Sequence, residues 1–169
     1  MSAITEDVPQ LLHSMASQLQ QQLTAAQIAQ PCMVGIHTGG VWVARELHRL
    51  LGLDTPLGTL DISFYRDDFS RIGMHPQVKP SELPFEVEDR PIILVDDVLQ
   101  SGRTVRAAMN EIFDYGRPAQ ILLAVLVERP GRELPIQADV CGLRVELNSQ
   151  QQIKLHGPES LSLSIQEVS

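Results

Sequence analysis

Two adjacent carboxylates, Asp96 and Asp97, directly follow an apolar stretch at residues 91–95. We predict that this stretch is a buried strand of a parallel sheet, because such strands are near-continuous runs of Ile, Leu and Val. The strand would deliver both acids to the carboxyl edge of the sheet, where open α/β folds bind their ligands. Two neighbouring carboxylates repel each other unless they accept hydrogen bonds, which the hydroxyl pair of a ribose or the waters around Mg²⁺ would supply.

The turn after these acids has the composition of an anion site. Ser101 and Thr104 carry hydroxyl donors, and Gly102 allows the backbone to approach a phosphate closely. A helix is predicted to begin at residue 103, and the free amides at a helix N-terminus, with the helix dipole behind them, bind anions. Residues 96–104 therefore predict a site for a sugar phosphate.

A simpler interpretation of the same residues stays open. Asp97 and Ser101 could serve only as caps in an ordinary strand–turn–helix unit. Paired acids after an apolar strand also occur at the phosphate and metal sites of other α/β folds. The Walker pattern GxxxxGK[ST] and the dinucleotide pattern GxGxxG before this helix are both absent. Those two kinds of nucleotide site are therefore not predicted.

A second turn of similar type follows another apolar run, at residues 32–36. Its four residues are His37, Thr38, Gly39 and Gly40. A glycine pair between a strand and a helix suits a second anion site on the same sheet edge. The same residues would also suit a plain turn at the start of a helix.

The elements that must position these turns alternate between strand and helix patterns. Apolar residues spaced by three and four predict an amphipathic helix over about residues 7–26. Further helices are predicted over 41–51 and 103–115, each ended by a glycine. Strands are predicted at 32–36, 57–62, 91–95 and 120–127, with weaker β signals at 140, 153–155 and 161–165. This alternation predicts an α/β fold with a mostly parallel sheet in one domain, 1–169.

Composition narrows the class of protein further. The chain has 169 residues, of which 43% are hydrophobic, and a formal net charge of −8, as in a globular protein rather than a disordered one. No apolar run reaches the roughly 20 residues of a membrane helix, and the N-terminus lacks a signal sequence, so a cytoplasmic location is expected. Cys32 and Cys141 are interpreted as small buried hydrophobes. No Lys or Arg precedes Arg45, which disfavours a nucleic-acid partner.

Several segments together resemble the PyrR family of pyrimidine operon regulators and uracil phosphoribosyltransferases. The resemblance runs through most of the chain in the family's order, and the pairing of Tyr-Arg-Asp-Asp at 65–68 with Arg-Glu-Leu-Pro-Ile at 132–136 is specific to that family. The resembling segments are residues 35–40, 61–68, 95–108, 132–136 and 138–139.

This resemblance implies a type I phosphoribosyltransferase fold, with a twisted sheet flanked by helices and a small C-terminal hood. It implies transfer of ribose 5-phosphate from phosphoribosyl pyrophosphate (PRPP) to uracil, giving UMP and pyrophosphate, with Mg²⁺ held through water by Asp96 and Asp97. These two acids would hold the ribose hydroxyls. The residues implied to hold the 5′-phosphate are Val98, Leu99, Gln100, Ser101, Gly102, Arg103 and Thr104. The turn at 37–40 resembles the family's pyrophosphate loop.

Three further expectations come from the same resemblance. The polar segment at 66–88 resembles the loop that closes over the reaction, and Arg66 is its predicted catalytic residue, ahead of Arg71 and Lys79. The base is expected beneath the hood. Its implied contacts are Arg129, Val140 and Ile153. A homodimer or a larger homo-oligomer is also implied.

This chain departs from the family pattern at three places. Gln100 stands where many phosphoribosyltransferases have an acid and the regulator family often has Tyr, and a glutamine cannot act as a general base. His37 and Gly39 stand where the pyrophosphate loop commonly has Lys and Arg, so fixed charge near the leaving group is lost. The helix predicted over 7–26 has no Lys or Arg, although RNA-binding members draw part of a basic surface from it.

These departures leave alternatives beside the enzyme. One is a regulator that binds mRNA in response to UMP or PRPP, which the charge distribution disfavours. Another is a nucleotide sensor with little turnover. A purine substrate is less favoured, because the resemblance is to the uracil group.

Overall fold

The structure is a computed structural model that describes residues 2–3, 6–62 and 81–168. Its centre is a five-stranded, wholly parallel sheet with the strand order β3-β2-β4-β5-β6. The strands are β2 (Cys32–Ile36), β3 (Gly58–Leu60), β4 (Pro91–Leu99), β5 (Gln120–Glu128) and β6 (Val140–Arg144). This arrangement confirms the predicted α/β fold.

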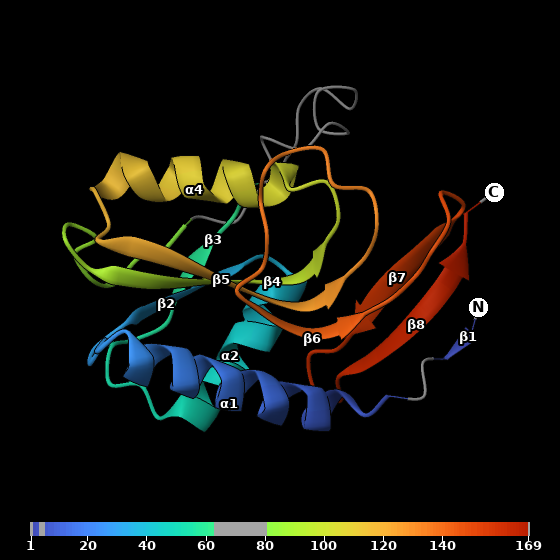
Figure 1. Cartoon of the computed structure of the whole chain (residues 1–169), viewed down its shortest axis with the longest axis horizontal. Coiled ribbons are helices and arrows are strands. Elements are labelled where there is room, and N and C mark those ends of the chain that lie inside the picture. Colours follow the sequence, from blue (N-terminus) through green and yellow to red (C-terminus); the bar gives the residue numbers. More distant parts are fainter. Residues whose placement is uncertain (1, 4–5, 63–80, 169) are drawn as a thin grey trace.

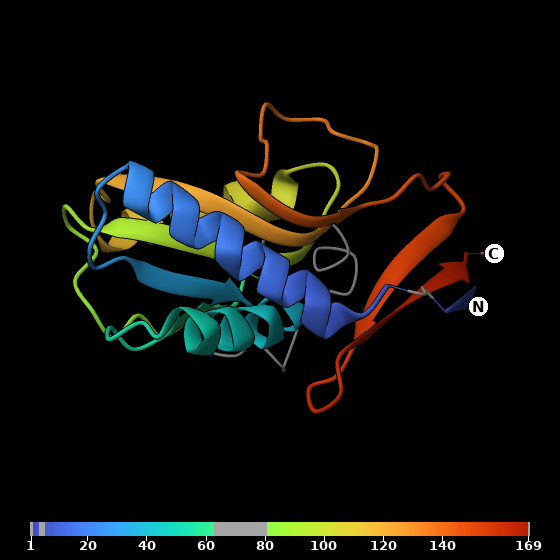
Figure 2. The ribbon, with the colours of Figure 1, turned by 60° about the horizontal axis from the view of Figure 1, so that its bottom comes forward.

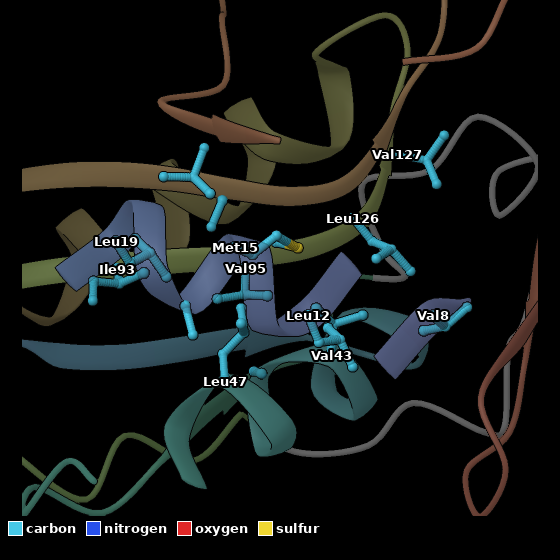
Figure 3. Packing of buried hydrophobic residues seen from close by; sticks show 14 of the residues in the cluster. Val8, Leu12, Met15, Leu19, Val43, Leu47, Ile93, Val95, Leu126 and Val127 are labelled. Carbon is cyan, nitrogen blue, oxygen red and sulfur yellow. The ribbon is translucent and has the colours of Figure 1, made fainter. Parts of the chain in front are cut away.

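Helices cover both faces of this sheet (Figure 1). Helix α1 (Val8–Ala25) and helix α2 (Gly39–Leu51) lie on one face, and helix α4 (Arg103–Tyr115) lies on the other. The apolar stripe of α1 is buried against the sheet, where Leu12, Met15 and Leu19 pack near Ile93 and Leu126 (Figure 3). Because strands that are buried on both faces must be apolar throughout, the continuous runs in β2 and β4 follow from this two-sided cover.

A second, antiparallel sheet has the strand order β1-β8-β7. It combines β1 (Ser2–Ala3) with the hairpin of β7 (Gln151–His156) and β8 (Ser162–Glu167), so the two ends of the chain lie side by side. Figures 1 and 2 place this sheet beyond the carboxyl ends of the parallel strands. It is the small C-terminal unit that the predicted hood requires.

Two element boundaries differ from the sequence prediction. Helix α2 begins at Gly39, two residues earlier than predicted. The two glycines of the segment at 37–40 are therefore the first two residues of the helix. Strand β4 continues to Leu99 instead of ending at Val95. The reason is that pairing with β5 persists through Asp96↔Val125 and Leu99↔Glu128, which keeps the acidic pair within the strand.

The two cysteines are free thiols. Cys32 is fully buried in β2, as predicted, and burial raises the pKa of its thiol. Cys141 is only half-buried in β6, and the prediction of a buried residue is wrong in that respect. Among the described helices, none combines the length and the hydropathy needed to cross a bilayer.

Candidate functional site

The two predicted acids lie at the carboxyl end of β4. Asp96 is 5% exposed and Asp97 is half-buried. Each carboxylate accepts a hydrogen bond from the next backbone amide, so that Asp97 N donates to Asp96 Oδ1 and Val98 N donates to Asp97 Oδ1, both at 2.8 Å. These local bonds fix the carboxylates in an otherwise apolar strand. They also show that Asp97 does not cap the helix, which begins at Arg103.

The turn after β4 presents backbone amides to a cavity of about 290 Å³. Gly102 adopts φ +93°, a left-handed conformation that glycine tolerates, and α4 begins at the next residue. Ser101 Oγ accepts a hydrogen bond from Arg103 N at 3.1 Å, a local bond within the turn, and the N-cap residue of α4 is Gly102, with no side-chain cap.

Several amides of this turn remain available for a ligand. Ser101, Gly102, Thr104 and Val105 line this cavity, and their backbone N–H groups have no hydrogen-bond acceptor among the described residues. Unpaired amides at a helix start, next to the positive end of the helix dipole, form an anion site.

Parallel pairing brings the second predicted turn against the acids. Gly35 of β2 pairs with Val95 of β4, so residues 37–40 leave the sheet beside Asp96 and Asp97. The approach is close: a Cβ atom on Gly39 would overlap Asp97 Oδ2. A Cβ atom on Gly40 would lie 2.8 Å from the Val95 carbonyl oxygen. Both glycines are therefore required by close packing, and the two turns form one site.

His37 and Thr38 complete this turn. The His37–Thr38 peptide bond is cis, and His37 N donates a hydrogen bond to Leu60 O at 2.8 Å. Thr38 is exposed and precedes α2 directly. The turn holds no Lys or Arg, so what it could offer to an anion is the start of α2 and not a fixed side-chain charge.

A second cavity, of about 490 Å³, adjoins the first. Leu99 and Gln100 line both cavities, which places the two side by side. The other walls come from the end of β5, the segment after it and the end of β6. They are Glu128, Arg129, Pro130, Gly131, Arg132, Ile136, Gln137, Ala138, Arg144, Val145 and Glu146.

The walls of the second cavity carry positively and negatively charged side chains. Arg144 Nε donates to Glu128 Oε2 at 2.7 Å, and this hydrogen bond raises the pKa of the arginine, which is a permanent positive charge. Arg129 is buried at 7% exposure, and its guanidinium donates to the Gln151 and Asn148 carbonyls at 2.7 and 3.1 Å. Arg129 thus joins β5 to the turn before β7.

Of the three residues predicted to contact a base, only Arg129 lines this cavity. Val140 is 1% exposed and pairs with Ala124, well before the carboxyl end of the sheet. Ile153 is 8% exposed and packs in the same core cluster as Val140. The prediction for Val140 and Ile153 is therefore corrected, because their side chains are used in core packing and present almost no surface to a ligand.

Arg66, Arg71 and Lys79 lie outside the described residues, and their predicted roles stay predictions. Most of residues 130–138 form a wall of the second cavity, a position that the sequence does not predict. A signal for them existed, because residues 132–136 belong to the family-specific pattern. That pattern gave no physical reason for their position.

The donor set at the acids fits Mg²⁺, which prefers oxygen ligands and is commonly held by one or two carboxylates with substrate phosphates and water. Asp96 and Asp97 supply carboxylate oxygens beside the amide-lined cavity. Within residues 2–3, 6–62 and 81–168, no group of three or more His, Cys, Asp or Glu side chains forms a metal cage. Asp96 and Asp97 could therefore supply part of the oxygen ligands of such an ion.

Comparison with known proteins adds independent support. Residues 3–157 match the phosphoribosyl transferase domain family. A protein of Nitrosococcus oceani named bifunctional protein PyrR is 58% identical over 167 residues, covering 98% of this chain and 94% of its own. The protein of that name from Pseudomonas fluorescens is 53% identical and covers 94% of each chain.

Solved structures show the same fold at much lower identity. A purine phosphoribosyltransferase from Pyrococcus horikoshii superposes with a TM-score of 0.62 at 24% identity, over 82% of each chain. A hypoxanthine phosphoribosyltransferase from Trypanosoma cruzi gives a TM-score of 0.65 at 18% identity, over 85% of this chain and 76% of its own. The chain therefore belongs to the phosphoribosyltransferase family and, within it, to the group of the bifunctional PyrR proteins.

Proposed function

We propose that the protein transfers ribose 5-phosphate from PRPP to uracil, producing UMP and pyrophosphate. The observation that carries this proposal is the junction of two cavities at Leu99 and Gln100. One cavity combines two carboxylates with unpaired amides, and the other is larger and has mixed polarity. A ribose phosphate in the first would present its C1 atom toward a base in the second.

The first cavity matches the two polar ends of a ribose 5-phosphate. The amides of Ser101, Gly102 and Thr104 would donate to the phosphate oxygens. The carboxylates of Asp96 and Asp97 would accept hydrogen bonds from the ribose hydroxyls. As the C1–O bond breaks, positive charge develops on the ribose, and the two fixed carboxylates beside it stabilise that charge.

The turn at 37–40 would receive the leaving pyrophosphate. Its glycines lie against Asp96 and Asp97, and the start of α2 aims backbone amides in the same direction. Bound Mg²⁺ would supply neutralisation of the pyrophosphate charge. Uracil N1 forms the new bond to C1, the electron pair of the old C1–O bond leaves with pyrophosphate, and the N1 proton passes to a pyrophosphate oxygen or to water. Gln100 can hydrogen-bond in this space but cannot accept the proton.

The proposal is tested by incubating the protein with PRPP, Mg²⁺ and labelled uracil. We expect UMP and pyrophosphate in equal amounts, with hypoxanthine as a poor substitute for uracil. PRPP binding without UMP at high protein concentration would instead support the nucleotide sensor. The absence of both binding and turnover would refute the proposed function.

A second function is favoured by one observation, the name bifunctional given to the relatives. The regulatory alternative would use mRNA as its partner. This alternative lacks a basic surface on α1, which has no Lys or Arg, and Arg49, Arg103 and Arg144 are each paired with a glutamate. Each missing contact with a phosphate lowers the affinity for RNA and also makes that affinity less dependent on salt concentration.

We therefore expect any complex with RNA to be weak. In a gel-retardation assay with a pyrimidine-operon leader transcript and UMP, the complex should form only at low salt and disappear at physiological salt. A stable complex at physiological salt would show that a basic surface exists which this charge distribution does not reveal. A cytoplasmic location and a homo-oligomer stay predictions.

A further inference from the structure

The segment at residues 131–138, here called the strap, connects β5 to β6 and arches past the start of α4 (Figure 1). The proposed reaction gives it no chemical role. It nevertheless contacts every residue from Gln100 to Arg103, here called the phosphate turn. Some of these contacts are made by the backbone and others by side chains.

The backbone contacts fix one peptide plane. The amides of Glu133 and Leu134 both donate to the Ser101 carbonyl oxygen, at 3.0 and 3.1 Å. A trans peptide unit is planar, and its C=O and N–H groups point in opposite directions. Because the Ser101 carbonyl faces the strap, the Gly102 amide of the same peptide unit faces away from it. That amide has no acceptor among the described residues, and Gly102 lines the phosphate cavity.

Side chains hold the rest of the turn. Arg103 Nε donates to Glu133 Oε1 at 2.8 Å. Ile136 Cβ lies 3.3 Å from the position that a Cβ atom on Gly102 would occupy. The Gln100 side chain lies against Gly131, because a Cβ atom placed on Gly131 would be 3.1 Å from Gln100 Nε2. The strap therefore fits the turn at each successive residue.

We propose that the strap holds the phosphate turn in the orientation that binds phosphate, and that Glu133 is the positioning residue of the strap. This inference rests on the proposed function only in taking the turn as the site of the 5′-phosphate. Glu133 acts through Arg103: their ion pair holds the strap in register, which keeps the Ser101–Gly102 peptide unit turned with its amide toward the ligand.

Electrostatics and positioning make opposite predictions for Glu133. Its carboxylate lies near the site of an anion, so removing its charge should strengthen phosphate binding if charge alone matters. If Glu133 positions the turn, removing the ion pair should weaken phosphate binding. Both side chains of the pair are 57% exposed, and exposed pairs are weak, so we expect a change of about two- to fivefold.

The experiment compares Glu133→Gln with the unaltered protein by calorimetry, using ribose 5-phosphate and, separately, pyrophosphate. We expect the dissociation constant for ribose 5-phosphate to rise by about two- to fivefold. The constant for pyrophosphate should not change, because that ligand is assigned to the turn at 37–40. Glu133→Asp should restore part of the affinity. Asp114→Asn, which removes one exposed carboxylate from α4, is the charge-matched control and should have no such effect.

A double-mutant cycle with Arg103→Gln tests whether the two side chains act together. We expect Glu133→Gln to add almost nothing once Arg103 has been replaced. Tighter or unchanged ribose 5-phosphate binding in Glu133→Gln, or fully additive effects in the cycle, would overturn the proposal. Ribose 5-phosphate and pyrophosphate contain no base. These binding measurements can therefore be interpreted even if the protein does not convert uracil to UMP. Failure of the unaltered protein to bind ribose 5-phosphate would instead count against the proposed function itself.

Discussion

Replacing Asp97 by asparagine should reduce kcat/KM for PRPP by roughly 10- to 100-fold while leaving the melting temperature nearly unchanged. A hydrogen bond to a charged group contributes about 1.5–3 kcal/mol, and the charge near C1 is lost as well. The fold should tolerate the change, because the amide oxygen of asparagine can still accept the hydrogen bond from Val98 N. Steady-state kinetics and thermal unfolding measure the two effects.

The control for Asp97→Asn is a carboxylate removed at a distance from both cavities. Asp114→Asn on α4 serves again, and its kinetics should match those of the unaltered protein. If Asp97→Asn left PRPP affinity intact but melted earlier, Asp97 would be a structural residue of the strand end. The assignment of the acids to ribose would then be wrong.

Replacing Gly39 by alanine should be about as damaging, with a loss of about 100-fold in kcat/KM. The added Cβ atom would overlap Asp97 Oδ2 and lie 2.8 Å from Asp97 Cγ, so the carboxylate must move. Misplacing a group at a reacting centre by about 1 Å can cost roughly 100-fold in rate. Gly39 has no left-handed backbone angle, so the effect should come from this contact and not from backbone strain.

A second substitution separates this contact from other effects of Gly39→Ala. In an Asp97→Ala background the carboxylate is absent, and the remaining contact of an alanine at 39 with residue 97 is 3.2 Å to its Cβ atom, which a small shift relieves. We expect the Asp97→Ala protein and the Gly39→Ala/Asp97→Ala protein to have equal activity. A further large loss in the double variant would show that Gly39 acts on something other than Asp97.

The same contact concerns one departure from the family pattern, the glycine at residue 39. With Gly39 against Asp97, any larger residue at 39 would collide with the carboxylate in this arrangement. The missing charge in the pyrophosphate turn and the close packing of the two turns are therefore linked. Under the proposed function, the start of α2 would replace a side-chain cation, and its contribution would be smaller because a helix terminus carries only about half a charge.

Sequence alone determined the elements whose signals are local. Helix α1 follows from the spacing of its apolar residues, and the core of β4 follows from an unbroken apolar run. The phosphate turn was predicted with its acids, Gly102 and the start of α4, because strand, turn and helix start lie within a few consecutive residues. The end of β4 was misjudged, since Asp96 looks like a strand terminator when its partner Val125 is not considered.

Tertiary structure alone decided which distant segments share the site. Parallel pairing of β2 with β4 puts Gly39 against Asp97, and the strap places Glu133 on Ser101, which lies far away in the chain. It also placed Val140 and Ile153 in the core instead of at the base cavity. Helix and turn preferences come from interactions between near neighbours in sequence, whereas contacts between segments depend on the packing of the whole chain.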